Sequence, residues 1–170
     1  MKLIESKTLA SAAAAIEFTS IPQTFDDIVL VFSGRSTGSF VMAGYALTIN
    51  SNASITFIQL VGNGSTATRS TGTDGYLGNL PGANATSNTF GNSSIYIPNY
   101  RLSVNKSISF DGVAENNATE SNQVIGAALW SNTAAITSLA LTVGNTLAVG
   151  STASLYGITK GSDGIVTTSP

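Results

Sequence analysis

Residues 26–33 read Asp-Asp-Ile-Val-Leu-Val-Phe-Ser, so that five consecutive apolar side chains, Ile28 to Phe32, follow two acidic residues. Aspartates in this position are typical of a turn that leads into a strand. An unbroken apolar run of this length is typical of a strand that is covered on both faces. We therefore expect residues 26–33 to form a buried central strand.

The segments on either side have the same character, with short β-branched or aromatic stretches separated by Gly, Asn, Ser and Pro. The pattern predicts strands at 3–9, 14–20, 26–33, 45–49, 55–61, 94–98, 107–114, 124–130, 136–143 and 153–159. No helical crossover separates them, which favours an all-β fold, a two-sheet antiparallel β-sandwich of jelly-roll type, over a parallel sheet. We expect one such domain over residues 1–160 and a polar C-terminal tail over 161–170.

Two stretches are less regular. The run Ala12 to Ala15 favours helix, but it is about one turn long, and Ile16 and Phe18 then alternate with polar neighbours, which indicates a strand. The sequence Gly62-Asn63-Gly64 predicts a hairpin turn. Residues 65–92 contain few apolar side chains, and we expect them to form a long surface excursion.

Only 9% of the 170 residues are charged, so the surface must be polar by other means. The chain contains 23 Ser, 21 Thr and 14 Asn, but no Cys and no His. A disulfide scaffold, the usual zinc sites, a thiol nucleophile and a Ser-His-Asp triad each need a residue type that is missing. We therefore expect a protein that is not an enzyme and that holds no cofactor.

Charge and hydropathy also limit the partners. Seven basic residues against nine acidic ones give a formal net charge of −2, with no cluster of Lys or Arg, so we expect no nucleic-acid binding. No apolar stretch approaches the roughly 18 residues that a membrane helix needs. Glu5, Ser6 and Lys7 interrupt the apolar core that a signal peptide would require. We expect no membrane partner and no cleaved leader.

The carboxylates give no catalytic or metal-binding pattern. A glycosidase needs two facing carboxylates, and no spacing among the nine acidic residues pairs any two, although this alternative stays open. Asp26 and Asp27 could supply half of a calcium site, but the spacing of a calcium-binding loop is absent. Turn residues are the simpler interpretation, and we assign no catalytic and no metal-binding residue.

Residues 98–101 read Pro-Asn-Tyr-Arg and are expected to form a loop. Tyr and Arg are enriched at the centres of protein interfaces. Asn99, Tyr100 and Arg101 are therefore our candidate partner interface, with ordinary surface as the open alternative. We expect Tyr96 and Trp130 to pack in the core.

Four strings match a known pattern in order along the chain. They are IEFTSIPQTFDDIVL (16–30), IYIPNY (95–100), WSNTAAI (130–136) and GSTASLYGI (150–158). They resemble a family of small tailed-phage virion structural proteins. The resemblance implies a virion component with a jelly-roll sandwich and no catalytic residues.

The resemblance is compatible with two placements. A capsid decoration (cement) protein would lie on the outer capsid surface of the virion, as a homotrimer that binds the major capsid protein at inter-subunit junctions. A tail-fibre or receptor-binding module would bind a host surface glycan or protein. We favour decoration, because the first strand is expected almost at once after Met1 and only about eleven residues follow the last, which leaves no room for a shaft. A secreted lectin remains a third alternative.

Overall fold

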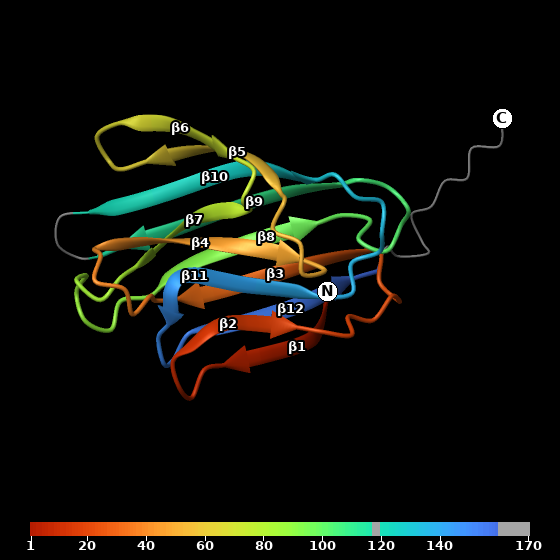
Figure 1. Cartoon of the computed structure of the whole chain (residues 1–170), viewed down its shortest axis with the longest axis horizontal. Helices are drawn as coiled ribbons and strands as arrows, with labels where there is room; N and C mark the ends of the chain where they lie inside the picture. The colour runs from red at the N-terminus through yellow and green to blue at the C-terminus, as the bar shows by residue number, and fades with distance from the viewer. Residues whose placement is uncertain (117–119, 160–170) are drawn as a thin grey trace.

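A computed structural model describes residues 1–116 and 120–159. These residues form twelve strands in two antiparallel sheets, so the predicted all-β sandwich is confirmed (Figure 1). The strands are β1 (Lys2–Thr8), β2 (Ala13–Phe18), β3 (Asp27–Gly34), β4 (Met42–Ile49), β5 (Thr56–Gly62), β6 (Ala67–Gly72), β7 (Tyr76–Pro81), β8 (Gly91–Ile97), β9 (Lys106–Glu115), β10 (Ser121–Trp130), β11 (Leu139–Leu147) and β12 (Thr152–Ile158).

The larger sheet has eight strands in the order β1-β12-β3-β8-β9-β10-β5-β6, and the smaller sheet has four in the order β2-β11-β4-β7. The first four strands of the chain alternate between the two sheets, as do β7, β8, β11 and β12. Two hairpins, β5-β6 and β9-β10, interrupt this alternation. They build the half of the larger sheet that lies away from β1 and β2 in Figure 1, here called the four-strand extension (β9-β10-β5-β6).

The apolar run around Leu30 lies in β3, near the middle of the β1-β12-β3-β8 half of the larger sheet. Ile28, Leu30 and Phe32 are buried between the sheets, as predicted, and the Phe32 ring lies edge-on to Tyr45 of β4 with centroids 5.4 Å apart. The expectation of burial on both faces is wrong, because Val31 is 43% exposed. Within the described residues the smaller sheet covers only the inner face of β3.

Residues 65–92 do not form the expected surface excursion. They contain β6 and β7, and Leu77 and Leu80 of β7 are fully buried. The low apolar content of this stretch misled the prediction, because an edge strand needs only one buried side chain in two. The loop after β7 is held by Arg35, whose guanidinium donates to the backbone carbonyls of Thr86 (2.8 Å), Thr89 (3.0 Å) and Ala85 (3.0 Å).

Two further predictions are confirmed. The alanine-rich stretch is strand β2, in which Ile16 and Phe18 pair with Leu141 and Leu139 of β11. The Gly62-Asn63-Gly64 stretch turns β5 into β6. The Asn63 side chain accepts from the backbone N–H of Thr66 at 2.8 Å, and Gly64 supplies the left-handed backbone (φ 88°) that the turn requires.

The described residues up to 159 all belong to this sandwich and its loops, whereas the tail predicted over 161–170 lies outside the described residues. No helix within the described part of the chain is long and apolar enough to cross a membrane.

Candidate functional site

The predicted interface residues lie in the loop after β8, at one end of the sandwich. Tyr100 is fully buried, so the expectation that its side chain lies on the surface is wrong. Its hydroxyl donates to the Pro22 carbonyl, and its own carbonyl accepts from the Ile136 N–H at 2.9 Å. Burial raises the pKa of the Tyr100 hydroxyl above its ordinary value. Tyr100 therefore joins three loops from the inside rather than anchoring a partner.

Asn99 and Arg101 flank this buried ring. Asn99 adopts a left-handed backbone (φ 53°), and its N–H donates to Oδ1 of Asp27 at 2.8 Å. The other oxygen of Asp27 accepts from the Tyr96 hydroxyl at 2.9 Å. Arg101 is exposed and forms an ion pair with Asp26 at 3.0 Å. The carboxylates of Asp26 and Asp27 thus accept hydrogen bonds from donors of the protein itself. These bonds explain the two residues better than the alternative that they form part of a calcium site.

Lys106, at the start of β9, is a buried cation in the same end of the molecule. Its Nζ donates to the carbonyls of Leu102 (2.8 Å) and Ala134 (2.9 Å) and to that of Val104, and it lies 5.7 Å from the centroid of the Trp130 ring. Burial lowers the pKa of this ammonium group. Trp130 lies in the core, as predicted. We call this hydrogen-bonded set the end clasp: residues 21–27, 96–106 and 133–136.

The end clasp leaves a short apolar tip in solvent. Leu102 and Val104 are exposed in the loop that the clasp holds, and they follow Arg101 in the sequence. Two backbone hydrogen bonds, Leu102 N–H to Asn99 O (3.0 Å) and Val104 N–H to Leu102 O (2.9 Å), fix the loop locally. The tip is therefore preorganised, and it extends the predicted interface from Asn99 and Arg101 to Leu102 and Val104.

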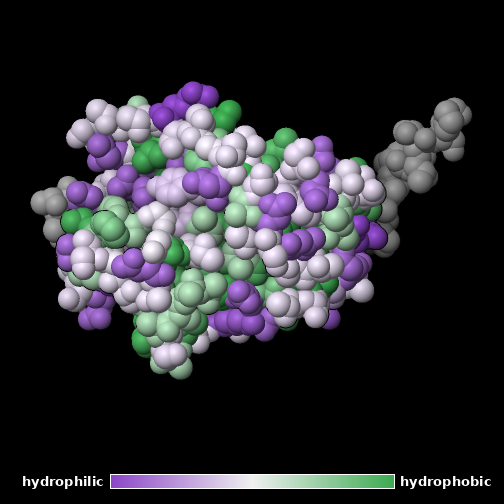
Figure 2. All heavy atoms as spheres, in the orientation of Figure 1, coloured by the Kyte–Doolittle hydropathy of each residue, from purple (hydrophilic) through white to green (hydrophobic). Residues whose placement is uncertain are grey.

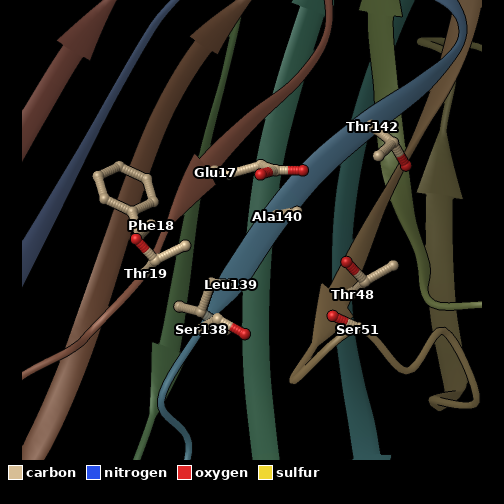
Figure 3. Close-up of a pocket in the computed structure, with 9 residues that line it drawn as sticks. All are labelled: Glu17, Phe18, Thr19, Thr48, Ser51, Ser138, Leu139, Ala140 and Thr142. Atoms are coloured by element: carbon tan, nitrogen blue, oxygen red, sulfur yellow. The ribbon is translucent and has the colours of Figure 1, made fainter.

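The outer face of the smaller sheet contains a hollow of about 270 Å³ (Figure 3). Thr48, Ser51, Ser138 and Thr142 contribute hydroxyl groups, and Glu17 points from β2 toward β11. Glu17 is the single acidic residue among those lining the hollow, so the hollow lacks the pair of carboxylates that glycoside hydrolysis uses. Its hydroxyl-rich lining suits hydrogen bonding to a polar ligand.

Small and hydroxylated side chains also dominate the rest of this face. Figure 2, in the orientation of Figure 1, shows a largely white surface with scattered purple and a pale-green area at its lower centre. On this face the Tyr76 ring occupies the space above Gly44, where a Cβ would lie 2.2 Å from the ring, and its hydroxyl donates to Asn79 at 2.7 Å. Burial raises the pKa of Tyr76.

The outer face of the four-strand extension is different. Ile125 (62% exposed), Leu60 (55%), Ile58 (53%) and Leu129 (42%) project from the neighbouring strands β10 and β5. Ala127 completes the patch, because it pairs with Ile58 while Ile125 pairs with Leu60. We call these five residues the open face. An apolar group of this kind on a polar molecule marks an interaction surface.

Sequence reasoning missed the open face, although a signal for it was present. In β5 and β10 both alternating sets of side chains are largely apolar, so periodicity could not tell which set is buried. Gln59 is on the buried side and Leu60 on the exposed side of β5. The carbonyl cage around Lys106, formed by the backbone oxygens of Leu102, Val104 and Ala134, could not be predicted from the sequence. Every residue type has a backbone carbonyl, so no residue pattern identifies these acceptors.

The described residues contain no group of three or more Asp, Glu, His or Cys side chains that could hold a metal ion. Comparisons of the chain with protein-family models, with curated proteins and with solved structures found no match.

Proposed function

We propose that this protein is a non-enzymatic virion structural protein that decorates the outer surface of a tailed-phage capsid and binds the major capsid protein where its subunits meet. Such binding stabilises the assembled shell by mass action, because the decorating protein binds the assembled state and not free subunits.

The observation that carries the proposal is the order of the strands. Without the two inserted hairpins, β1-β12-β3-β8 faces β2-β11-β4-β7. Consecutive strands then alternate between these two four-stranded arrays, except that β4 is followed by its neighbour β7 in the smaller sheet. We interpret this arrangement as a jelly roll of eight strands. Viral capsid proteins use this architecture, and lectins use it as well.

The four strings that resemble virion proteins lie close together in the structure, at the end clasp. The four strings 16–30, 95–100, 130–136 and 150–158 all contribute to it or adjoin it. The first three meet through Tyr100, Pro22 and Ile136, and the Asp26 N–H donates to the Ile158 carbonyl at 2.8 Å. The residues of these strings thus hold together one end of the sandwich, which supports a structural role for them rather than a chemical one.

The exposed tip of the end clasp is the proposed contact with the shell. Leu102 and Val104 offer apolar side chains that follow the cation Arg101 in the sequence, and the clasp holds them in place before binding. A preorganised loop loses little conformational entropy on docking. A surface with few charges also permits dense packing of copies on a shell, since neighbours repel each other weakly.

The test is to mix the purified protein with tailed-phage particles that lack a decoration protein, and separately with host cells, and to image both by electron cryo-microscopy. The proposal predicts regular density on the shell. Bare shells together with protein bound to cells would overturn it and support receptor recognition.

A pair of variants locates the contact. Leu102→Asp with Val104→Asp should lower occupancy on the particles at least tenfold, because two buried carboxylates would lack partners. Val149→Asp is the control, since Val149 is exposed in the turn before β12, at the other end of β3 from the tip. Equal occupancy for both variants would exclude the tip as the contact.

The hollow beside Glu17 supports a second candidate function, recognition of a host glycan by a tail-fibre or receptor-binding module. Hydroxyl groups and one carboxylate are suitable partners for sugar hydroxyls. At about 270 Å³ the hollow is close to the lower limit for a small-ligand site. Phe18, the aromatic residue among its lining, is buried in the core and offers no exposed ring for stacking on a sugar. Binding to a glycan array that Glu17→Gln and Thr48→Val abolish would establish this candidate.

A further inference from the structure

The open face is an apolar feature of the described surface that the proposed function does not use. It lies on the outer side of the larger sheet, and the smaller sheet covers only the inner side. The pairing registers give the arrangement of side chains on it. Asp111 of β9 pairs with Ile125, Ile125 pairs with Leu60, and Leu60 pairs with Arg69 of β6. One row across the extension is therefore acidic, apolar, apolar and basic.

Among the residues that the structure describes, no opposite charge is paired with either end of this row. Asp111 and Arg69 are exposed, and within the described residues neither forms an ion pair. They lie three strand spacings apart, about 14 Å, which is too far for direct contact with each other. The nearest positions toward one end of this face are polar and uncharged, Ser107 and Ser109 on β9 and Thr71 on β6. Farther along β9 in the other direction lie Val113 and Glu115.

We propose that the open face binds a second copy of this chain, forming a two-fold symmetric dimer in which the extensions stack face to face. The two-fold axis lies between the two stacked sheets, runs parallel to the strands and passes over the boundary between β10 and β5. It places the second copy's row opposite the first in reverse strand order. Ile125 of one copy then faces Leu60 of the other, and Arg69 faces Asp111 on both sides of the apolar centre. The row is thus complementary to itself, as a symmetric interface requires.

The same operation matches the neighbouring row. Ala127 faces Ile58 of the second copy, so that a small side chain lies opposite a large one, as packed sheets require. Strand β3 lies two strands beyond β9 and has no counterpart in the second copy, so Val31 stays outside the overlap. A substitution of Val31 is therefore a control for the loss of an exposed apolar side chain on the same face of the same sheet.

The size of the overlap predicts a weak dimer. Four strands at about 4.8 Å spacing and some seven residues of length give a projected area of about 440 Å² per copy. A standard interface buries about 800 Å² per partner. The dimer should therefore dissociate on dilution, and mass should be measured over a range of concentrations.

The first experiment is sedimentation velocity over a concentration series. The unmodified protein should pass from monomer to dimer as concentration rises. The variant Leu60→Thr with Ile125→Thr should weaken association at least tenfold, whereas Val31→Thr should leave it unchanged. Circular dichroism and a urea unfolding curve check that each variant is folded. A monomer at every concentration, or a dimer that the paired threonines do not weaken, would overturn the inference. So would a trimer, which is the state that the resemblance to decoration proteins implies.

The second experiment tests which residues face each other. Arg69→Asp alone and Asp111→Arg alone should each weaken the dimer, because each places like charges opposite one another. The double reversal should restore association to within about threefold of the original. Since the two residues are too far apart to interact within one chain, such restoration requires contact between copies. If the double variant loses as much association free energy as the two single variants together, the proposed axis is overturned.

These measurements use free protein and do not depend on the proposed function. Shell decoration by a protein that stays monomeric would overturn only this inference, and a dimer without shell binding would leave the inference standing.

Discussion

The end clasp and the open face differ in how their side chains are paired. In the end clasp, polar groups of Tyr100, Asp27 and Lys106 are buried, and each has hydrogen-bond partners from another loop. In the open face, apolar side chains such as Ile125 and Leu60 are exposed, and they lie beside each other on neighbouring strands of the sheet. Both regions reverse the usual rule of apolar inside and polar outside.

In a chain with so few charges, this difference indicates which residues stabilise the fold and which are available for binding. A buried polar group costs free energy unless it is hydrogen-bonded, so a saturated polar cluster fixes one conformation and is damaged by loss of a single partner. An exposed apolar group contributes little to the isolated fold. Substitutions in the end clasp should therefore change stability, and substitutions in the open face should change association.

The largest expected effect is at Tyr100. Tyr100→Ala should lower the free energy of unfolding by about 3–5 kcal/mol, as for other large aromatic side chains removed from a core. Tyr100→Phe keeps the ring and loses only the hydrogen bond to Pro22, which should cost about 1 kcal/mol. Urea denaturation measures both. Equal losses for the two variants would show that the ring packing contributes nothing.

Lys106 should come next. Lys106→Met keeps the apolar stem but removes the ammonium donor from the carbonyls of Val104 and Ala134 and one of two donors from the Leu102 carbonyl, which should cost about 2 kcal/mol. Lys7→Met is the matched control. Lys7 also lies near an aromatic ring, 5.5 Å from the centroid of Phe18, but it is exposed and pairs with Glu5 at 3.3 Å, so its loss should cost under about 0.5 kcal/mol. Indistinguishable unfolding midpoints for the two variants would contradict the role of the carbonyl cage.

Alkaline pH should act on the clasp and the core but not on the open face, which contains no tyrosine. Burial is the largest cause that raises the pKa of Tyr45, Tyr96 and Tyr100. Because the folded pKa lies above the unfolded value of about 10, the stabilisation is fully present below that pH and is lost as pH rises further. The urea midpoint should fall as pH rises from about 10 to about 11.

Two phenylalanine variants check the source of this pH dependence. Tyr100→Phe and Tyr45→Phe should each make the alkaline decline shallower, because each removes one group that ionises more readily in the unfolded chain. A midpoint that stays constant above about pH 10 would contradict the pKa shifts.

The smallest effect on stability is expected at the open face. Ile58→Thr keeps the β-branched shape and should change the free energy of unfolding of the monomer by under about 0.5 kcal/mol. Ile28→Thr makes the same change at a buried position of β3 and should cost at least about 2 kcal/mol, since it removes core volume and buries a hydroxyl group. A similar cost at both positions would show that the open face is already covered in the monomer.

Much of the fold could be predicted from local pattern. The strand at Ile28 to Phe32, the alternation at Ile16 and Phe18, and the Asn63-Gly64 turn were each assigned correctly, because strand and turn preferences depend on a few adjacent residues. The burial of both faces of the Ile28 to Phe32 strand was not, because it depends on what packs against each face. Strand β7 was missed, since Leu77 and Leu80 are too few to give a recognisable period.

The site could be predicted only in part. Asn99 and Arg101 do lie at an exposed loop, but Tyr100 turns inward, and whether a loop tyrosine is buried depends on Pro22 and Ile136, which are remote in sequence. The open face was not predictable, because β5 and β10 carry apolar residues on both sides.

The sequence by itself determined that the protein is an all-β sandwich with a charge-poor, hydroxyl-rich surface, because strand pattern and composition are local properties. Only the tertiary structure decided which side of each apolar strand faces solvent, and which carbonyls surround Lys106. These depend on how hairpins from distant parts of the chain extend one sheet past the other, and that order is set by packing of the whole molecule.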